Sequence, residues 1–294
     1  MNSFYVFLYF IFPPVVLVFG LFGNILGFSL MKRPGMSSIG PRDTFKYLFV
    51  FDIINLLQII VNYLQFSFNM DPTILSSFSC KVWFYMSYSV TTPSAMLLAY
   101  ISIDGYVSLK IPARRFLLRK RNYQFIYCMI VLMWNLIYYM PTVYMSNIYS
   151  VNDTTICNYD SDYDQNLLSY MDLVNRVCLP SLIITIFSFL LAIEVIKSKQ
   201  RILANFKEEE NRYYFKQIRL AISSIFLNIT YIASQLPLSI VQFEPNYYLL
   251  DAYMLTYYLY YLSYAINFYV LLLFNSVFKS ELTAFVNRLI MHVK

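Results

Sequence analysis

Few residues of this chain could carry out acid–base or metal chemistry. Only one of its 294 residues is a histidine, His292, and it lies among the last three. Three acids, Asp52, Asp104 and Glu194, instead lie inside long apolar runs. A carboxylate in such surroundings needs a partner, a cation or a proton, because its burial is otherwise costly. The residues therefore predict ion binding or hydrogen bonding, and we expect neither an enzyme nor a cofactor beyond an ion.

Asp52 is the most informative of these acids, because Asp104 and Glu194 lie near the ends of their runs, where water could hydrate them. Oxygen-bearing side chains that could accompany it lie on other apolar runs: Asn24, Ser94, Ser263 and Asn267. Carboxylate, hydroxyl and amide oxygens are the hard ligands that a small cation prefers. The same groups could form an interhelical hydrogen-bond network without any ion. The residue types alone leave both interpretations open.

The elements that must position these residues are membrane helices. The chain is 59% hydrophobic and only 13% charged, against about 25% charged in soluble domains. This excludes a soluble enzyme, a disordered chain and a nucleic-acid-binding protein. Seven apolar runs are long enough to span a bilayer, and none has the alternation of barrel strands. The predicted fold is all-α, one domain over 1–294 with helices at 6–31, 45–67, 81–109, 122–145, 168–196, 216–241 and 248–274.

The basic residues predict how this bundle is oriented. Twenty of the 22 Lys and Arg residues fall in the loops and tail of one side, which leaves Lys81 and Arg176 on the other. The positive-inside rule then places the N-terminus outside and the C-terminus in the cytoplasm. The first helix is too long for a signal peptide and is expected to be a spanning anchor. Residues 275–290 have apolar side chains at helical spacing, which predicts an amphipathic eighth helix on the inner leaflet.

The cysteines and one sequon agree with this orientation. Cys80 and Cys157 both fall on the predicted outer side, whereas Cys128 and Cys178 lie within apolar runs. Because the outer side meets an oxidising compartment, we expect a Cys80–Cys157 disulfide. In the same outer loop, Asn152 begins an Asn-Asp-Thr sequon and is a candidate for N-glycosylation.

Eight landmarks, taken in order along nearly the whole chain, resemble a divergent rhodopsin-like G-protein-coupled receptor, of the type of invertebrate peptide receptors. They are Gly23-Asn24, Asp52, Cys80, Trp134, Pro180, Pro237, Asn267 and Phe278-Lys279. The resemblance implies a plasma-membrane receptor with an extracellular ligand. It also implies helix rearrangement as the signal, a heterotrimeric G protein as partner, and a sodium ion held by Asp52, Ser94, Ser263 and Asn267.

Three departures from the family pattern concern signalling. The Asp-Arg-Tyr motif becomes Asp104-Gly105-Tyr106, so the arginine that meets the G protein is absent. The helix-six Cys-Trp-x-Pro becomes Ser-Gln-Leu-Pro at 234–237, and Asn-Pro-x-x-Tyr becomes Asn-Phe-Tyr-Val-Leu at 267–271. A second hypothesis follows, a receptor-shaped protein that binds a ligand or a partner with weak or no G-protein coupling.

The resemblance also limits the class of ligand, because it implies a ligand pocket lined by Ser87, Gln235 and Tyr261. Ser87 replaces the Asp of amine receptors, and Tyr261 replaces the retinal Lys of opsins. Eight acids fall on the predicted outer side: Asp71, Asp153, Asp160, Asp162, Asp164, Asp172, Glu244 and Asp251. An acidic, Tyr-rich mouth favours a small basic or amidated peptide. A transporter or channel is disfavoured, because internal repeats and paired intramembrane charges are not apparent.

Overall fold

The structure is a computed structural model that describes residues 3–38, 40–111, 121–151, 154–204, 208–241 and 250–293. The first span combines α1 (Ser3–Val6), the π-helical turn η1 (Phe7–Ile11) and α2 (Phe12–Met31). It is followed by the 3₁₀ turn η2 (Pro34–Ser38), α3 (Arg42–Phe68) and a second 3₁₀ turn, η3 (Pro72–Leu75). Asp52 and the Asn and Gln residues that follow it on α3 therefore lie on one uninterrupted helix.

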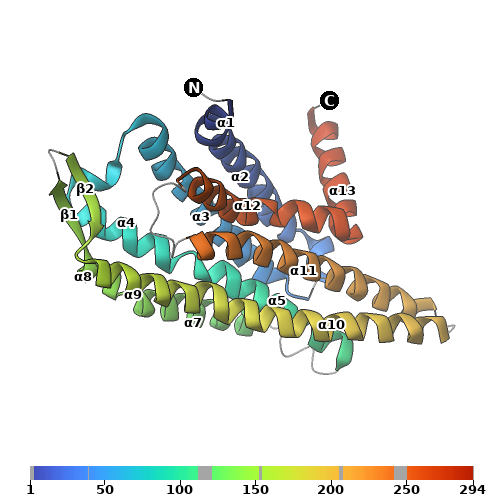
Figure 1. Cartoon of the computed structure of the whole chain (residues 1–294). Helices are drawn as coiled ribbons and strands as arrows, with labels where there is room; N and C mark the ends of the chain where they lie inside the picture. Colours follow the sequence, from blue (N-terminus) through green and yellow to red (C-terminus); the bar gives the residue numbers. More distant parts are fainter. Residues whose placement is uncertain are drawn as a thin grey trace.

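Proline divides the third span into two helices, where the sequence predicted one helix over 81–109. α4 (Ser77–Ser89) and α5 (Thr92–Lys110) are separated by a turn at 90–91, and Pro93 lies at the start of α5. Proline has no N–H to donate to the carbonyl four residues earlier, so the helix restarts there. Figure 1 shows α4 and α5 following one path through the bundle. Pro141 divides the fourth span in the same way, into α7 (Arg121–Tyr138) and α8 (Pro141–Met145).

The fifth and sixth spans extend beyond the predicted bounds of 168–196 and 216–241, whereas the seventh lies within the predicted 248–274. The fifth comprises α9 (Asp162–Asp172), the π-helical segment η4 (Leu173–Cys178) and α10 (Leu179–Ala204). The sixth is α11 (Glu208–Val241), which continues through Pro237. Then follow α12 (Leu250–Phe274) and α13 (Ser276–Val293). Lys, Arg and Glu have helix propensities close to those of Leu and Met, so a helix can continue beyond the apolar layer. Hydropathy alone does not detect these polar ends.

A β-hairpin stands at one end of this helical bundle. β1 (Ser146–Val151) pairs antiparallel with β2 (Thr154–Tyr159), with Ile148 opposite Cys157. These two strands were not predicted from the sequence, although the predicted all-α class is correct for the bundle. The sequon residue Asn152 lies outside the described residues.

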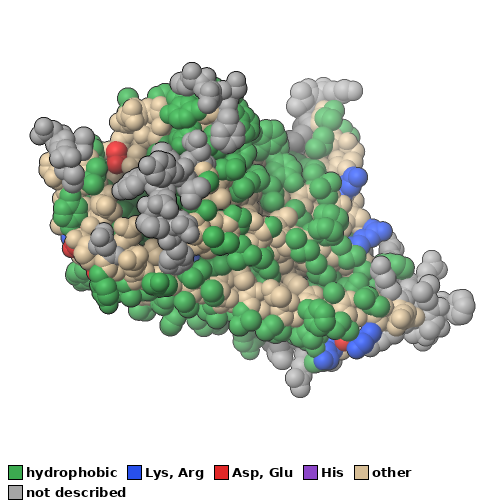
Figure 2. Space-filling view, viewed as in Figure 1, with side chains coloured by type: hydrophobic (Ala, Val, Ile, Leu, Met, Phe, Trp, Pro, Cys, Tyr) green, Lys and Arg blue, Asp and Glu red, His purple; other side chains and the backbone are tan. Residues whose placement is uncertain are grey.

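The bundle exposes apolar side chains on its lateral surface. Six segments of the described chain are long and apolar enough to cross a membrane, and α4 with α5 supplies a further traverse. Figure 2 shows hydrophobic side chains over the body of the molecule, whereas the visible Lys and Arg side chains gather at the end away from the hairpin. Examples of exposed apolar residues are Phe19 and Phe22 on α2, Ile137 on α7 and Phe189 on α10. The chain is therefore a multi-pass membrane protein.

Candidate functional site: a tyrosine-lined cavity at the hairpin end

A cavity of about 240 Å³ lies at the hairpin end of the bundle. Its walls come from α3, η3, α4, β2, α9, η4, α11 and α12. Four tyrosines of α12 line it, Tyr253, Tyr257, Tyr260 and Tyr261. A concave site with a few polar groups, built between the helices of a bundle, is the usual form of a ligand site.

The expected disulfide is present and fixes one wall of this cavity. Cys80 near the start of α4 is bonded to Cys157 of β2, and Cys157 lines the cavity. Ser77 of α4 also donates a hydrogen bond to Asn147 of β1 at 2.8 Å. The hairpin is thus tied to α4, and its strand β2 forms part of the cavity wall.

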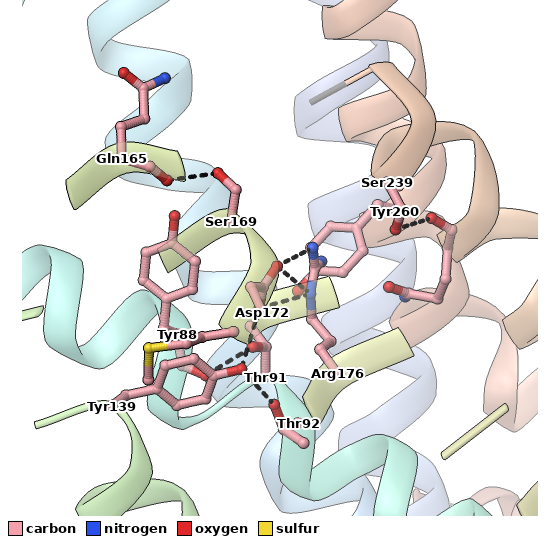
Figure 3. Close-up of polar contacts among 12 residues, drawn as sticks. Tyr88, Thr91, Thr92, Tyr139, Gln165, Ser169, Asp172, Arg176, Ser239 and Tyr260 are labelled. Atoms are coloured by element: carbon pink, nitrogen blue, oxygen red, sulfur yellow. Dashed lines mark hydrogen bonds and ion pairs between the residues drawn. The ribbon is translucent and has the colours of Figure 1, made fainter. Parts of the chain in front are cut away.

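A buried ion pair between Asp172 and Arg176 also lines the cavity (Figure 3). Arg176 Nε donates to both carboxylate oxygens of Asp172, at 3.0 and 2.9 Å, and Nη2 donates to Oδ2 at 2.5 Å. The hydroxyl of Tyr139 donates to Asp172 Oδ1 at 3.2 Å. Arg176 also lies over the ring of Tyr260, 4.7 Å from its centroid. The two charged residues are 1% and 4% exposed, so they depend on each other for neutralisation.

Pro180 explains the irregular backbone at this ion pair. It has no N–H, so the carbonyl of Arg176, four residues earlier, loses its α-helical partner. Residues 173–178 form the π-helical segment η4, and the hydroxyl of Tyr231 donates to the freed carbonyl at 2.6 Å. Tyr231 belongs to α11, so this bond joins the cavity wall to the sixth span.

A chain of hydrogen bonds runs along the α3–α12 side of the cavity. Asn62 Nδ2 donates to the Tyr257 hydroxyl at 2.5 Å, and the Tyr257 and Tyr261 hydroxyls lie 3.0 Å apart. Tyr261 then donates to Gln58 Oε1 at 3.3 Å. At the end of this chain Gln58 Nε2 has no partner within the described part of the protein.

Two of the three residues predicted to line the ligand pocket do line this cavity. Ser87 and Tyr261 line the cavity, but Gln235 does not and instead donates from Nε2 to Ser263 Oγ at 3.3 Å. Sequence reasoning missed the pairing of Asp172 with Arg176. The available signal was an acid and a base four residues apart inside a predicted span, a spacing that places them on one helix face.

The polar residues expected around Asp52 form two groups. Ser94 and Asn267 donate to its two carboxylate oxygens, the Asn267 bond being 2.7 Å long. Asn24 instead donates to the carbonyl of Tyr264 at 2.9 Å, and Ser263 donates to the carbonyl of Tyr260 at 2.7 Å. Asp52 thus ties α3 to α5 and α12, as the network hypothesis requires.

The residues expected to face a G protein lie at the far end of α5. Asp104 is buried, and Tyr106 accepts a hydrogen bond from Lys110 at 2.5 Å. A Cβ added at Gly105 would lie 3.3 Å from Leu191 Cδ2 of α10. Glycine therefore permits a close approach of α5 and α10 at the position where the family motif has arginine.

One comparison with known proteins identifies the architecture. The profile described as 7 transmembrane receptor (rhodopsin family) matches residues 46–278. No curated protein matches the chain significantly.

Proposed function

Since the chain belongs to the rhodopsin family of seven-transmembrane receptors, we propose that it binds an extracellular ligand in the tyrosine-lined cavity and signals by rearranging its helices. The observation that carries this proposal is the Tyr231 bond to the Arg176 carbonyl, because it joins the cavity wall to α11. A ligand that moved Arg176 would disturb this bond and bias the position of α11.

A second polar contact restrains α11 closer to the opposite end. Asn228 Nδ2 donates to Ser102 of α5 at 2.8 Å and to Ser188 of α10 at 2.6 Å. Tyr231 and Asn228 are three residues apart and so lie on neighbouring positions of one helix face. Outward movement of α11 would break both sets of bonds, which gives the bundle two distinct arrangements that a ligand could select between.

The ligand that fits best is a small peptide, basic or amidated. Gln58, Asn62 and Gln65 offer amide groups to a peptide at the cavity, and the tyrosines offer rings and hydroxyls. Asp160 at the end of the hairpin is exposed and accepts a hydrogen bond from Tyr149, which raises the pKa of that tyrosine. The acid remains on the outside of the cavity, where it would attract a basic peptide.

The orientation follows from the same arrangement. The N-terminus and the disulfide-linked hairpin face the exterior, with Asn152 glycosylated there, and α13 lies on the cytoplasmic face of the plasma membrane. The visible basic side chains at the end away from the hairpin support this orientation.

A sodium ion at Asp52 accompanies this function. The donor chemistry fits, because the carboxylate and Ser94 Oγ supply oxygens and Asn55, one helical turn further along α3, is fully buried. Both polar atoms of the Asn55 amide lack partners in the described residues, which leaves its oxygen available for an ion or a water molecule.

A second candidate function is ligand binding with weak or no G-protein coupling. The packing of Gly105 against Leu191 favours it, because this position presents no cation to a transducer. Nucleotide exchange stimulated by a bound peptide, measured on wild type and Gly105→Arg, separates the two functions. Gly105→Ala is the matched control, since it adds the same Cβ without the guanidinium. Exchange in the wild type supports coupling, whereas exchange only in Gly105→Arg supports the second function. Loss of exchange in both substitutions would indicate that the contact with Leu191 matters instead.

A further inference from the structure

The deep wall of the cavity offers unused hydrogen-bond donors, whereas its acidic acceptor is fully used. Asp172 accepts three bonds from Arg176 and one from Tyr139. The bonds of Arg176 to Asp172 use Nε and Nη2, and its guanidinium also hydrogen-bonds the hydroxyl of Tyr260. Gln58 Nε2 and Ser87 Oγ lack partners in the described part of the chain, although both residues line the cavity. Gln58 is only 7% exposed, so its Nε2 depends on a group that enters the cavity for a hydrogen-bond partner.

We propose that the cavity recognises the uncharged carboxamide end of a peptide, with Arg176 and Gln58 donating to the carboxamide oxygen. Asp172 is then a positioning residue, because its carboxylate fixes the guanidinium plane at the cavity wall. The carboxamide NH₂ would donate to a hydroxyl such as that of Ser87, which can accept as well as donate. This inference rests on the proposed function and specifies which part of the ligand enters the cavity.

The charges of the site favour a neutral group over an ionised one. Asp172 and Arg176 are the only charged residues that line the cavity in the described chain, and they neutralise each other. A carboxylate entering here would share one guanidinium with Asp172 and would repel it at low dielectric. An ammonium would meet the guanidinium itself. A carboxamide satisfies the spare donors without adding charge.

The size of the cavity agrees with the entry of only one end of a ligand. Its volume of about 240 Å³ is below the roughly 300–1,000 Å³ of sites that enclose drug-sized ligands. The remainder of a peptide would lie against the hairpin, where Asp160 is exposed. The carboxamide and the basic residues of a peptide would therefore contact different parts of the site.

The test uses the full-length protein at the cell surface and fluorescent peptides in matched pairs. Each short peptide is made as a C-terminal amide and as a free acid, and the ratio of their affinities is measured. We expect the amide to bind at least about tenfold more tightly, which is the effect of about one well-formed hydrogen bond to a charged donor. Free acids that end in Asn or Gln distinguish a side-chain carboxamide from the main-chain one.

Two substitutions test the roles of the ion pair. Arg176→Lys keeps the positive charge but removes the planar, multiple-donor guanidinium, so the ratio of amide to free-acid affinity should fall towards one. Asp172→Asn leaves the guanidinium without its counter-charge, so the preference should turn towards the free acid. Lys81→Met, which removes the other cation on the outer side, should leave the ratio unchanged. If Asp172→Asn fails to reach the surface, Gln58→Leu replaces it and should weaken amide binding several-fold.

The outcomes distinguish this inference from the function on which it rests. Peptides that bind equally as amides and acids, or a ratio unaltered by Arg176→Lys, would overturn the carboxamide site but leave a peptide receptor. Tight binding of free acids that end in Asn or Gln would reassign the site to a ligand side chain. Binding of no peptide in either form would refute both.

Discussion

The ion pair between Asp172 and Arg176 makes the sharpest prediction about stability. Removing either partner should be costly, because the remaining charge is almost fully buried; the two residues are 1% and 4% exposed. The free energy of unfolding should fall by about 3–5 kcal/mol for Asp172→Leu or for Arg176→Met. Replacing both residues removes both charges together and should cost far less than the sum of the single substitutions.

The coupling energy between the two substitutions therefore measures the dependence of one charge on the other. It is expected to exceed about 3 kcal/mol. The assay is equilibrium unfolding of the purified protein in mixed micelles, for the wild type, both single variants and the double variant. The cycle does not depend on the identity of the ligand.

A matched control is the ion pair of Lys46 with Asp43, which has an N–O distance of 2.6 Å. Its side chains are 19% and 13% exposed, and the pair lies in the first turns of α3, at the end of the bundle away from the cavity. Coupling between Asp43→Asn and Lys46→Gln should be no more than about 1 kcal/mol. If the Asp172–Arg176 cycle gave a value as small as this control, the description of the pair as mutually dependent would be wrong.

Three further predictions concern α11, Asp52 and the hairpin. Tyr231→Phe should lower the free energy of unfolding by about 1–3 kcal/mol, because the buried Arg176 carbonyl loses the hydrogen bond from the Tyr231 hydroxyl. Tyr163→Phe, on an exposed side chain, should have little effect, and equal effects would refute the reasoning. Asp52→Asn should abolish any dependence of peptide affinity on sodium, and an unchanged dependence would leave only the hydrogen-bond network. Cys80→Ala and Cys157→Ala should reduce surface expression equally, because each breaks the same disulfide; peptide mapping that finds both thiols free in the wild type would contradict this.

The features predictable from sequence are those that a single helix or a single chemical environment determines. The apolar runs predict the membrane helices, since a membrane span must satisfy its own backbone. The predicted side of the membrane leads to the Cys80–Cys157 pair, because only these two cysteines fall on the predicted outer side, and the structure joins them by a disulfide. Asp52 and Asn267 could be matched to the family pattern, and the structure joins them by a hydrogen bond.

The features that the sequence missed depend on the neighbours of a residue in space. Asp172 was counted among the acids of the outer side because it lies near the start of the predicted 168–196 helix, but it hydrogen-bonds Arg176 and Tyr139. Gln235 was predicted to line the ligand pocket from its position in the family pattern. In the structure it donates to Ser263 and does not line the cavity. The hairpin was not anticipated because its pairing requires both strands, and neither strand is strongly apolar. Pro93 and Pro141 start new helices inside runs for which hydropathy predicted single helices over 81–109 and 122–145.

The claim on which the rest depends is that the tyrosine-lined cavity faces the exterior and α13 faces the cytosol. It can be tested on intact cells with a membrane-impermeant thiol reagent, in a background where the exposed Cys178 is replaced by alanine. Gln65→Cys places a thiol at the cavity and Ser280→Cys places one on α13. We expect labelling of Gln65→Cys on intact cells and of Ser280→Cys only after permeabilisation. The reverse pattern, or labelling of both from one side, would contradict the account.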